Sequence, residues 1–210
     1  QFPIITAAED LSAFAGYDVV FLATHPPVVM DVLGKLAPTL SAQATLVSLA
    51  PKITIGRMAA VIGNGNIARV NPSAPGVIGQ GINPVAFAEG MGEGKKAELL
   101  ELLGLLGKAF VVPESKIEAY AVISAMGSTY FWFQLKQLQD LALSFGMEEG
   151  EAGEVITEML RGTANTLFNS GLPAEEVMDL VPVRPLGDYE EAIKSYYSEK
   201  LNGIYTKIKP

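Results

Sequence analysis

Three short apolar runs, each of strand length, recur in the first half of the chain and constrain its fold more than any other feature. They cover residues 18–24, 45–49 and 67–70. Such nearly continuous apolar runs are typical of parallel strands that are buried on both faces of a sheet. Residues 28–37 and 54–62, which lie between the runs, have the character of helices, and Thr54 is placed to cap the second. This alternation predicts parallel α/β units.

The pattern is looser after residue 75. Further strands are expected at residues 82–88 and 109–112, with a helix over residues 95–106 between them. Four leucines of that helix are predicted to form one apolar stripe: Leu99, Leu102, Leu103 and Leu106. Two glycine clusters, at residues 63–65 and 76–81, lack the strand-to-helix context and the G-x-G-x-x-G spacing of a dinucleotide fingerprint. They are interpreted as turns that need positive φ.

Composition changes near residues 113–116. Residues 1–113 carry seven basic and eight acidic groups, whereas residues 114–210 carry eight basic and fifteen acidic groups. The second part also has long stretches without proline and apolar residues at helical spacing. The sequence therefore predicts a partial Rossmann-like α/β domain over residues 1–113 and an all-helical domain over residues 114–210. The expected helices cover residues 116–145, with a break or bend near Gly127, and residues 148–169, 173–181 and 188–206.

The segment over residues 130–143 is apolar on more than one side. A helix that is apolar nearly all round has to be buried, and in so small a domain a second subunit is a natural cover. A homodimer formed through the helical domain is therefore expected. The alternative is that this segment is the central helix of a monomeric bundle.

Several classes of function are disfavoured by composition. The net charge of −8 argues against a nucleic-acid partner, since binders of phosphate backbones depend on clustered basic side chains. The chain has no cysteine and a single histidine, His25, so no metal site is expected. The longest uncharged apolar run, residues 119–135, is too short and too polar to span a membrane. No basic leader followed by an apolar run opens the chain, so a cytoplasmic protein is expected.

The ends of the three predicted strands carry the best candidates for a ligand site. His25 follows the first strand, residues 50–52 follow the second and residues 71–75 follow the third. In open α/β sheets, ligands bind at the carboxyl ends of the strands, near helix N-termini that attract phosphate. The three loops together indicate a ligand crevice, although His25 alone is equally compatible with a histidine on a surface loop.

The order of these segments resembles that of the pyrroline-5-carboxylate reductases. Residues 18–26, Asp-Val-Val-Phe-Leu-Ala-Thr-His-Pro, are similar to the family's D-V-[VIL]-x-L-A-V-K-P, and residues 46–55 to V-S-x-A-A-G-[IV]-[ST]-I. Residues 69–75 are similar to R-x-M-P-N-T-P and are followed by a glycine pair. Residues 121–130 are similar to the A-[VL]-[ST]-x-[LA]-S-G-S-G-P-A-Y motif. Further landmarks in the same order bring the resemblance to nearly the whole chain.

The resemblance implies a Rossmann domain that binds NADP or NAD, joined to a helical domain that interlocks with its twin in a dimer. It also implies reduction of a cyclic imine carboxylate to proline, with the hydride supplied by the cofactor and the protein residues orienting it. The residues expected by this resemblance to border the cofactor are Ala23, Thr24, His25, Pro26, Ala50, Pro51, Asn71 and Ser73. No catalytic residue is assigned.

The chain departs from the family pattern at three places. The family's first strand and glycine-rich turn are not found ahead of Gln1, so the N-terminus is expected to be trimmed or unresolved and this chain alone is expected to be inactive. His25 replaces the family lysine, and the residues at 73–74 replace Asn-Thr. The substrate loop S-P-G-G-x-T is here the stretch 183–189. The candidates for substrate binding are Ser124, Ser128, Arg184, Gly187 and Tyr189.

These departures leave competing interpretations open. Because changed hydrogen-bonding groups alter specificity strongly, the substrate is expected to be pyrroline-5-carboxylate or a related imine or keto compound. Arg184 could clamp a carboxylate with two hydrogen bonds, or could be a surface or ion-pair arginine. A non-catalytic dimeric relative with a binding or regulatory role is the alternative. A dehydrogenase of the β-hydroxyacid type is weaker, since its helical-domain lysine would have to be Lys116 or Lys136, neither in a supporting motif.

Overall fold

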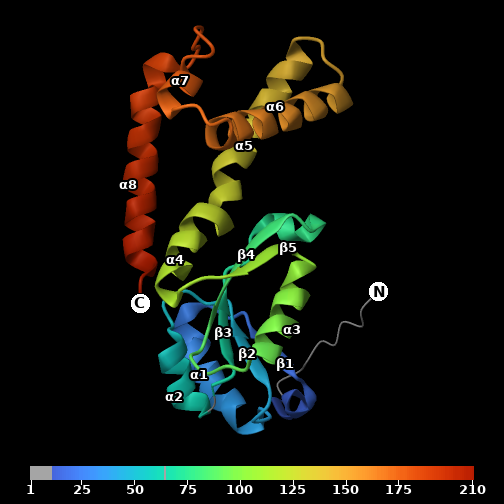
Figure 1. Cartoon of the computed structure of the whole chain (residues 1–210), viewed down its shortest axis with the longest axis vertical. Coiled ribbons are helices and arrows are strands. Elements are labelled where there is room, and N and C mark those ends of the chain that lie inside the picture. The colour runs from blue at the N-terminus through green and yellow to red at the C-terminus, as the bar shows by residue number, and fades with distance from the viewer. Residues whose placement is uncertain (1–10, 64) are drawn as a thin grey trace. The chain divides into compact units, whose positions relative to one another are not determined.

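The computed structural model describes residues 11–63 and 65–210, which form two compact units (Figure 1). The first unit comprises the described residues up to Ser128 together with Leu201–Pro210, and the second comprises Thr129–Lys200. The predicted division between residues 113 and 114 stays a prediction.

A five-stranded sheet forms the centre of the first unit. Its strands follow each other in chain order and are β1 (Val19–Leu22), β2 (Thr45–Ser48), β3 (Ile67–Val70), β4 (Gly81–Phe87) and β5 (Gly107–Val111). The pairs β1–β2, β2–β3 and β4–β5 are parallel. The predicted α/β class is therefore confirmed, with strands at the expected positions.

One junction of the sheet differs from the expected parallel arrangement, because β3 and β4 are antiparallel. Only residues 71–80, which include the 3₁₀ helix η3 (Ala74–Ile78), separate these two strands. A parallel return within one sheet needs a crossover of about a dozen residues or more, usually with a helix. The connection is too short for that, so the chain turns back beside β3.

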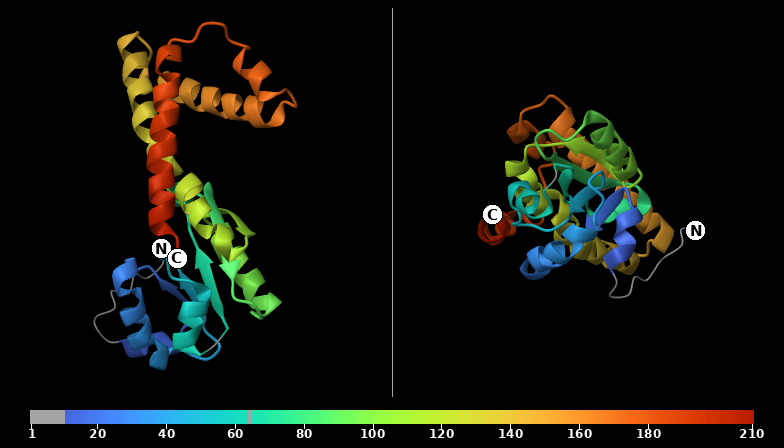
Figure 2. Two further views of the ribbon diagram at one scale, coloured as in Figure 1. Left: turned by 90° about the vertical axis from the view of Figure 1, so that its left-hand side faces the viewer. Right: turned by 90° about the horizontal axis from the view of Figure 1, so that it is seen from below.

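Both faces of the sheet are covered by helices (Figure 1, with further views in Figure 2). The helices α1 (Pro26–Leu36) and α2 (Ile55–Ile62) pack on the face that carries Leu46, whereas α3 (Glu93–Gly104) packs on the face that carries Val47. Successive residues of a strand point to opposite faces, so an all-apolar strand serves both cores. The short 3₁₀ helices η1 (Leu11–Gly16) and η2 (Ala37–Thr39) complete the connections.

The leucine stripe predicted for α3 is only half right. Leu99 and Leu103 are buried against the sheet, whereas Leu102 and Leu106 are 41% and 39% exposed. Leu99 and Leu103 are four residues apart and share one side of the helix, but Leu102 lies about 100° away from Leu103 around the axis. Leu106 lies beyond the end of the helix.

Glycine is required where β4 and β5 begin. Gly81 pairs with Gly107, and a Cβ on Gly107 would lie 2.3 Å from the carbonyl oxygen of Gly81. Gly107 also has a φ of +125°, which side-chain-bearing residues rarely adopt. Of the two glycine clusters interpreted as turns, Gly63 and Gly79 do have positive φ.

The chain leaves the sheet through a series of short helical segments. These are the 3₁₀ helix η4 (Glu114–Lys116), α4 (Ile117–Tyr120) and the π-helical turn η5 (Ala121–Ala125), followed by α5 (Gly127–Ser144). The irregularity expected near Gly127 is thus a π-turn just before it, closed by the hydrogen bond from Met126 N–H to Ala121 O at 2.9 Å. Ala121 and Val122 pack against the last turns of α8 (Glu190–Ile208) in a small apolar cluster of the first unit.

The second unit is built from helices and buries little of its own apolar surface. It contains most of α5, then α6 (Glu149–Asn169), α7 (Ala174–Met178), η6 (Gly187–Tyr189) and the first part of α8. Within this described unit only Ala142 and Ala152 are buried. The predicted helices are confirmed, although α7 is shorter than the expected residues 173–181. None of the helices in the described part of the chain is both long enough and apolar enough to cross a membrane.

Candidate functional site

The carboxyl ends of β1, β2 and β3 lie in one row. Leu22 pairs with Ser48, and Ser48 pairs with Arg69, so the loops that follow the three strands start side by side. Neighbouring strands lie about 4.8 Å apart, which places the outer two loops about 10 Å from each other where they leave the sheet. The row thus brings together the starts of the loops that carry all eight predicted cofactor residues: Ala23, Thr24, His25, Pro26, Ala50, Pro51, Asn71 and Ser73.

The loop after β1 contains a buried hydroxyl without a partner. Thr24 Oγ1 is shielded from solvent and has no hydrogen-bond partner among the described residues. Leaving a buried polar group unpaired costs about 1–3 kcal/mol, so such a group at a sheet edge is a natural place for a ligand atom. Ala23 and His25 on either side of it are exposed. His25 is the N-cap residue of α1, but its side chain does not cap the helix.

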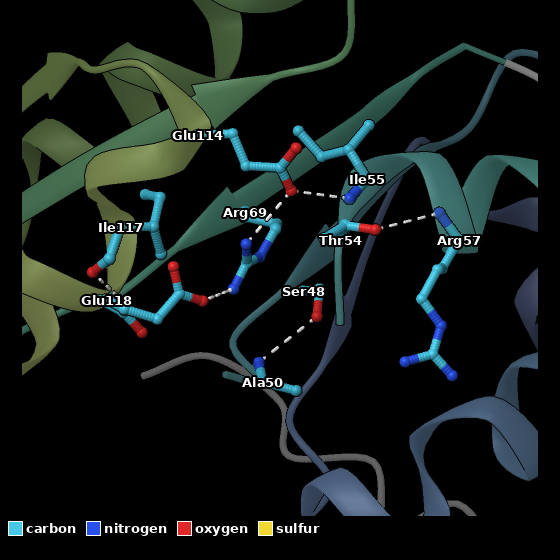
Figure 3. Close-up of polar contacts among 10 residues, drawn as sticks. Ser48, Ala50, Thr54, Ile55, Arg57, Arg69, Glu114, Ile117 and Glu118 are labelled. Carbon is cyan, nitrogen blue, oxygen red and sulfur yellow. Dashed lines mark hydrogen bonds and ion pairs between the residues drawn. The ribbon is translucent and has the colours of Figure 1, made fainter. Parts of the chain in front are cut away.

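The loop after β2 is held at its start and carries an unusual backbone conformation. Ala50 N–H donates to Ser48 Oγ at 3.3 Å (Figure 3). Ala50 is buried, and Lys52 is exposed with a φ of +69°, the left-handed region that favours glycine. The predicted cap of α2 is confirmed, since Thr54 Oγ1 accepts a hydrogen bond from Arg57 N–H at 3.3 Å.

In the loop after β3, the side chains of the two predicted site residues form hydrogen bonds that stabilise the conformation of the loop. Asn71 is buried and donates from Nδ2 to the carbonyl oxygen of Ile117 at 2.9 Å. Ser73 is also buried, and its Oγ accepts from Ile82 N–H at 2.8 Å. These contacts favour a positioning role over direct ligand contact.

A buried ionic cluster lies behind these loops and was not assigned from the sequence. Arg69 of β3 is 1% exposed and pairs with Glu114 Oε1 through Nη1 at 3.1 Å and more closely with Glu118 through Nη2 (Figure 3). The same oxygen of Glu114 accepts from Ile55 N–H at 2.7 Å. The signal was present as a lone charged residue inside an apolar strand, because a buried charge requires partners. Its partners could not be read from the sequence.

Few free donors remain at the helix starts along this edge. Pro26 and Pro27 occupy the first positions of α1 and have no N–H to offer. At the start of α2, Ile55 N–H is taken by Glu114 and Arg57 N–H by Thr54. A phosphate binds to free N–H groups at a helix N-terminus. The described edge therefore suits an uncharged ring or a sugar better than a pyrophosphate.

The predicted substrate residues fall into both units. Ser124 and Ser128 are half-buried in the first unit, and Ser124 Oγ donates to Tyr120 O at 2.8 Å within the π-turn. π-turns occur frequently at functional sites. Arg184 belongs to the second unit, together with the exposed residues Gly187 and Tyr189.

Arg184 is held by its neighbours in the second unit. Its Nη2 donates to Met178 O at 2.8 Å and forms an ion pair with Asp179. The ion-pair alternative considered for this arginine is thus present in the structure. A role for the five substrate candidates stays a prediction. Tyr130 lies two residues after Ser128 in the sequence. Burial raises the pKa of the Tyr130 hydroxyl, and the neighbouring Tyr197 raises it further.

The sequence is similar to known pyrroline-5-carboxylate reductases along most of its length. Residues 114–208 match the family model described as pyrroline-5-carboxylate reductase dimerisation. A pyrroline-5-carboxylate reductase of Corynebacterium melassecola is 25% identical over 209 residues, covering 98% of this chain and 77% of the relative. Pyrroline-5-carboxylate reductase 3 of Mus musculus is 29% identical over 154 residues, covering 73% of this chain and 56% of the relative.

Solved structures agree in fold. The pyrroline carboxylate reductase of Plasmodium falciparum, solved with NADP bound, has a TM-score of 0.80 at 19% identity and covers 96% of this chain and 80% of its own. The enzyme of Streptococcus pyogenes has a TM-score of 0.75 at 17% identity, over 94% of this chain and 78% of its own. The order of motifs, the Rossmann-like sheet with its helical unit and the matched dimerisation model agree with one another. The chain is similar to the pyrroline-5-carboxylate reductases over nearly its whole length, and residues 114–208 match the dimerisation model of that family.

Proposed function

We propose that this chain belongs to an NAD(P)H-dependent reductase that transfers hydride to a cyclic imine carboxylate, as in the last step of proline synthesis. The observation that carries the proposal is the row of three strand ends, at one end of which the buried Thr24 hydroxyl has no hydrogen-bond partner among the residues that the structure describes. Ligands of α/β sheets bind at this edge. Support also comes from the family relative of the same fold that was solved with NADP bound.

The residues at the edge fit the nicotinamide and ribose part of such a cofactor. Ala23 and Ala50 have small side chains that leave room for a flat ring, and the Thr24 hydroxyl is available to hydrogen-bond a polar atom of the cofactor. His25, Pro26 and Pro51 would complete the border. When bound, the cofactor supplies the hydride, and the protein residues hold and orient it.

The proposed substrate class is a cyclic imine carboxylate, either pyrroline-5-carboxylate or a related compound. The stretch 183–189 has none of the serine and threonine hydroxyls of the family's substrate loop, and Arg184 would have to exchange Asp179 for a substrate carboxylate. Such an exchange is open to an arginine whose side chain is 47% exposed. A related imine or keto acid is the natural alternative substrate, because the hydrogen-bonding groups have changed.

The proposed assembly is a homodimer formed through the helical unit. Large apolar side chains of α5 and α6 are exposed in the single chain, for example Phe133 at 69% and Phe168 at 78%. Apolar surface of this extent marks a protein interface. The family model matched by residues 114–208 is a dimerisation domain, which supports a second copy as the partner.

The second candidate function is a non-catalytic binding or regulatory protein of the same family. It is favoured by the changed substrate loop, by the prolines that open α1 without an N–H, and by the start of α2, where the N–H groups of Ile55 and Arg57 are already used. Such a protein would keep the dimer and the fold without turning over an imine.

The first test is oxidation of NADPH and NADH by the full-length gene product. Pyrroline-5-carboxylate is offered together with a panel of cyclic imines and keto acids. Turnover of pyrroline-5-carboxylate supports the reductase, and turnover of another compound in the panel supports a changed specificity. Absence of both turnover and cofactor binding favours the non-catalytic alternative.

A Thr24→Val variant tests the cofactor edge itself. Valine has the same shape as threonine but lacks the unpaired hydroxyl. We expect the free energy of unfolding to stay the same or rise, while the Kd for NADPH rises by about threefold to tenfold because one hydrogen bond is lost. Thr206→Val, the same substitution at an exposed position of α8, is the matched control. An unchanged Kd in Thr24→Val would contradict the assignment of this edge.

A further inference from the structure

We propose that Glu114 is a positioning residue that sets the geometry of the loop after β2, and through it the border of the cofactor site. This inference rests on the proposed reductase function. The hydrogen bonds of Glu114 within the described residues go to Ile55 and Arg69, and none goes to one of the eight predicted cofactor residues. Glu114 opens η4, in the segment that leads from β5 into α4.

A single carboxylate oxygen makes two contacts that join distant parts of the first unit. Glu114 Oε1 accepts from Ile55 N–H at 2.7 Å and from Arg69 Nη1 at 3.1 Å (Figure 3). Ile55 begins α2, directly after the loop, and Arg69 lies on β3, one strand away from β2. Hydrogen bonds that involve an ionised group are roughly twice as strong as neutral ones. The Arg69 side chain is fully buried, which limits the screening of its pair with Glu114, although the Glu114 side chain is 32% exposed.

The loop after β2 is therefore fixed at both ends. Ala50 N–H is bound to Ser48 Oγ at the start, and Ile55 N–H is bound to Glu114 at the end. Between the two anchors, Lys52 has a φ of +69°. A residue with a Cβ adopts this conformation only when the surroundings impose it. Release of either anchor would let the backbone at Lys52 relax and would move Ala50 and Pro51.

The segment after β5 also holds the loop after β3. Asn71 Nδ2 donates to Ile117 O at 2.9 Å, and Glu118 binds Arg69 at the carboxyl end of β3. Residues 114–118 thus contact two of the three loops in the row. The same segment runs directly into the π-turn that contains Ser124, so it links the proposed cofactor border to a proposed substrate residue.

Glu114 does more than cap α2. Thr54 already provides the side-chain cap through Arg57 N–H, and this contact would remain without Glu114. What Glu114 adds is the connection between the end of the loop and Arg69. Sites of this kind work only when their geometry is held to within about 0.5 Å by supporting contacts. A supporting contact of this type is expected to act on cofactor kinetics and not on stability alone.

The test compares three variants of the full-length gene product. Glu114→Ala removes both contacts, Glu114→Gln keeps an oxygen that can accept from Ile55 N–H and Arg69, and Thr54→Ala removes only the helix cap. For each protein, kcat and KM for NADPH are measured together with amide hydrogen exchange of the peptide that covers residues 50–57. The thermal midpoint of each variant is also measured, so that kcat/KM values are compared between variants of similar stability.

We expect Glu114→Ala to exchange faster over residues 50–57 and to lose about tenfold in kcat/KM for NADPH, since a misplacement of about 1 Å can cost on the order of a hundredfold. Glu114→Gln should recover most of both losses. Thr54→Ala should lower the thermal midpoint but keep kcat/KM for NADPH within about twofold of the unsubstituted protein, because the link to Arg69 is intact.

Two results would overturn the proposal. One is unchanged exchange of residues 50–57 in Glu114→Ala, and the other is a kcat/KM that falls equally in Glu114→Ala and Thr54→Ala at matched stability. If the unsubstituted protein oxidises no NADPH with any substrate, the reductase function fails. The exchange measurement then still decides whether Glu114 fixes the loop.

Discussion

The two units of the chain treat charged and apolar side chains in opposite ways. In the first unit, Arg69 and Glu118 form an ion pair whose side chains are 1% and 3% exposed. In the second unit, the pair of Arg184 and Asp179 is 47% and 78% exposed. The first unit has enough apolar material on both faces of its sheet to enclose a charge and its partners.

The contrast extends to the apolar residues. Leu33, Leu46, Met58 and Leu99 are almost fully buried in the first unit. In the second unit four large aromatic residues of α5 and α6 lie at the surface of the single chain, namely Phe131, Trp132, Phe133 and Phe168. A sheet covered by helices completes its own interior, whereas isolated helices need another surface to cover them. The first unit thus encloses its own apolar core, whereas the second unit leaves large apolar side chains at the surface of the single chain.

The largest effect is expected from opening the buried ion pair. Arg69→Ala leaves Glu118 buried without its partner, so the free energy of unfolding should fall by about 3–5 kcal/mol. Arg161→Ala, which removes an exposed pair with Glu158, should leave the urea midpoint almost unchanged. Urea denaturation followed by circular dichroism measures both. A similar loss of unfolding free energy in the two variants would show that the buried ion pair of the first unit contributes no more to stability than the exposed pair of the second.

The next effect concerns the exposed aromatic residues of α5. Phe133→Asp places a charge on the surface that we propose to be the dimer interface, and the dissociation constant should rise by about thirtyfold or more, as for a typical hot spot. Ala97→Asp adds the same charge at an exposed position of α3 and should leave the dimer intact. Sedimentation equilibrium at micromolar concentration reports both. A monomeric unsubstituted protein would show that the second unit needs no partner copy.

Glycine-to-alanine changes should have opposite signs in the two units. Gly107→Ala brings a Cβ within 2.3 Å of Gly81 O at a positive φ, so we expect a loss of about 1–3 kcal/mol. Gly150→Ala lies in the first turn of α6 with open space around it, and should raise the free energy of unfolding by about 0.5 kcal/mol. Thermal denaturation compares them. A stabilising Gly107→Ala would mean that the start of the β4–β5 pair is not as tightly packed as described.

The smallest effect concerns the exposed charges of α8. A hydrogen bond from Lys194 lowers the pKa of Glu190 below its usual 4.5. A lowered pKa in the folded state contributes stability above the usual pKa, and this contribution is lost as the pH falls through the lowered value. Lys194→Met should therefore reduce the thermal midpoint slightly at neutral pH and leave it unchanged in acid below the folded pKa. An equal difference at both pH values would show that the ion pair is not its cause.

Much of the fold could be predicted from local sequence. The strands and helices of both units lie close to the predicted positions, and the Thr54 cap is present as expected. These features depend on residues within a few positions of each other, so they can be read from periodicity and capping chemistry. The resemblance to the pyrroline-5-carboxylate reductases, and with it the expectation of a cofactor edge, followed from motifs of the same short range.

The features that the sequence did not reveal depend on contacts between distant segments. The partners of Arg69 are of this kind, since Glu114 and Glu118 lie 45 and 49 positions away from it in the sequence. Glu114 meets Ile55 across 59 positions of sequence, and no local pattern encodes that encounter.

The sequence by itself determined the element order, the α/β class, the helical second part and the resemblance to the pyrroline-5-carboxylate reductases. Only the tertiary structure decided which loops lie at the same edge of the sheet and which charged side chains are buried together. The physical reason is that strand pairing brings residues into contact that are far apart in the sequence.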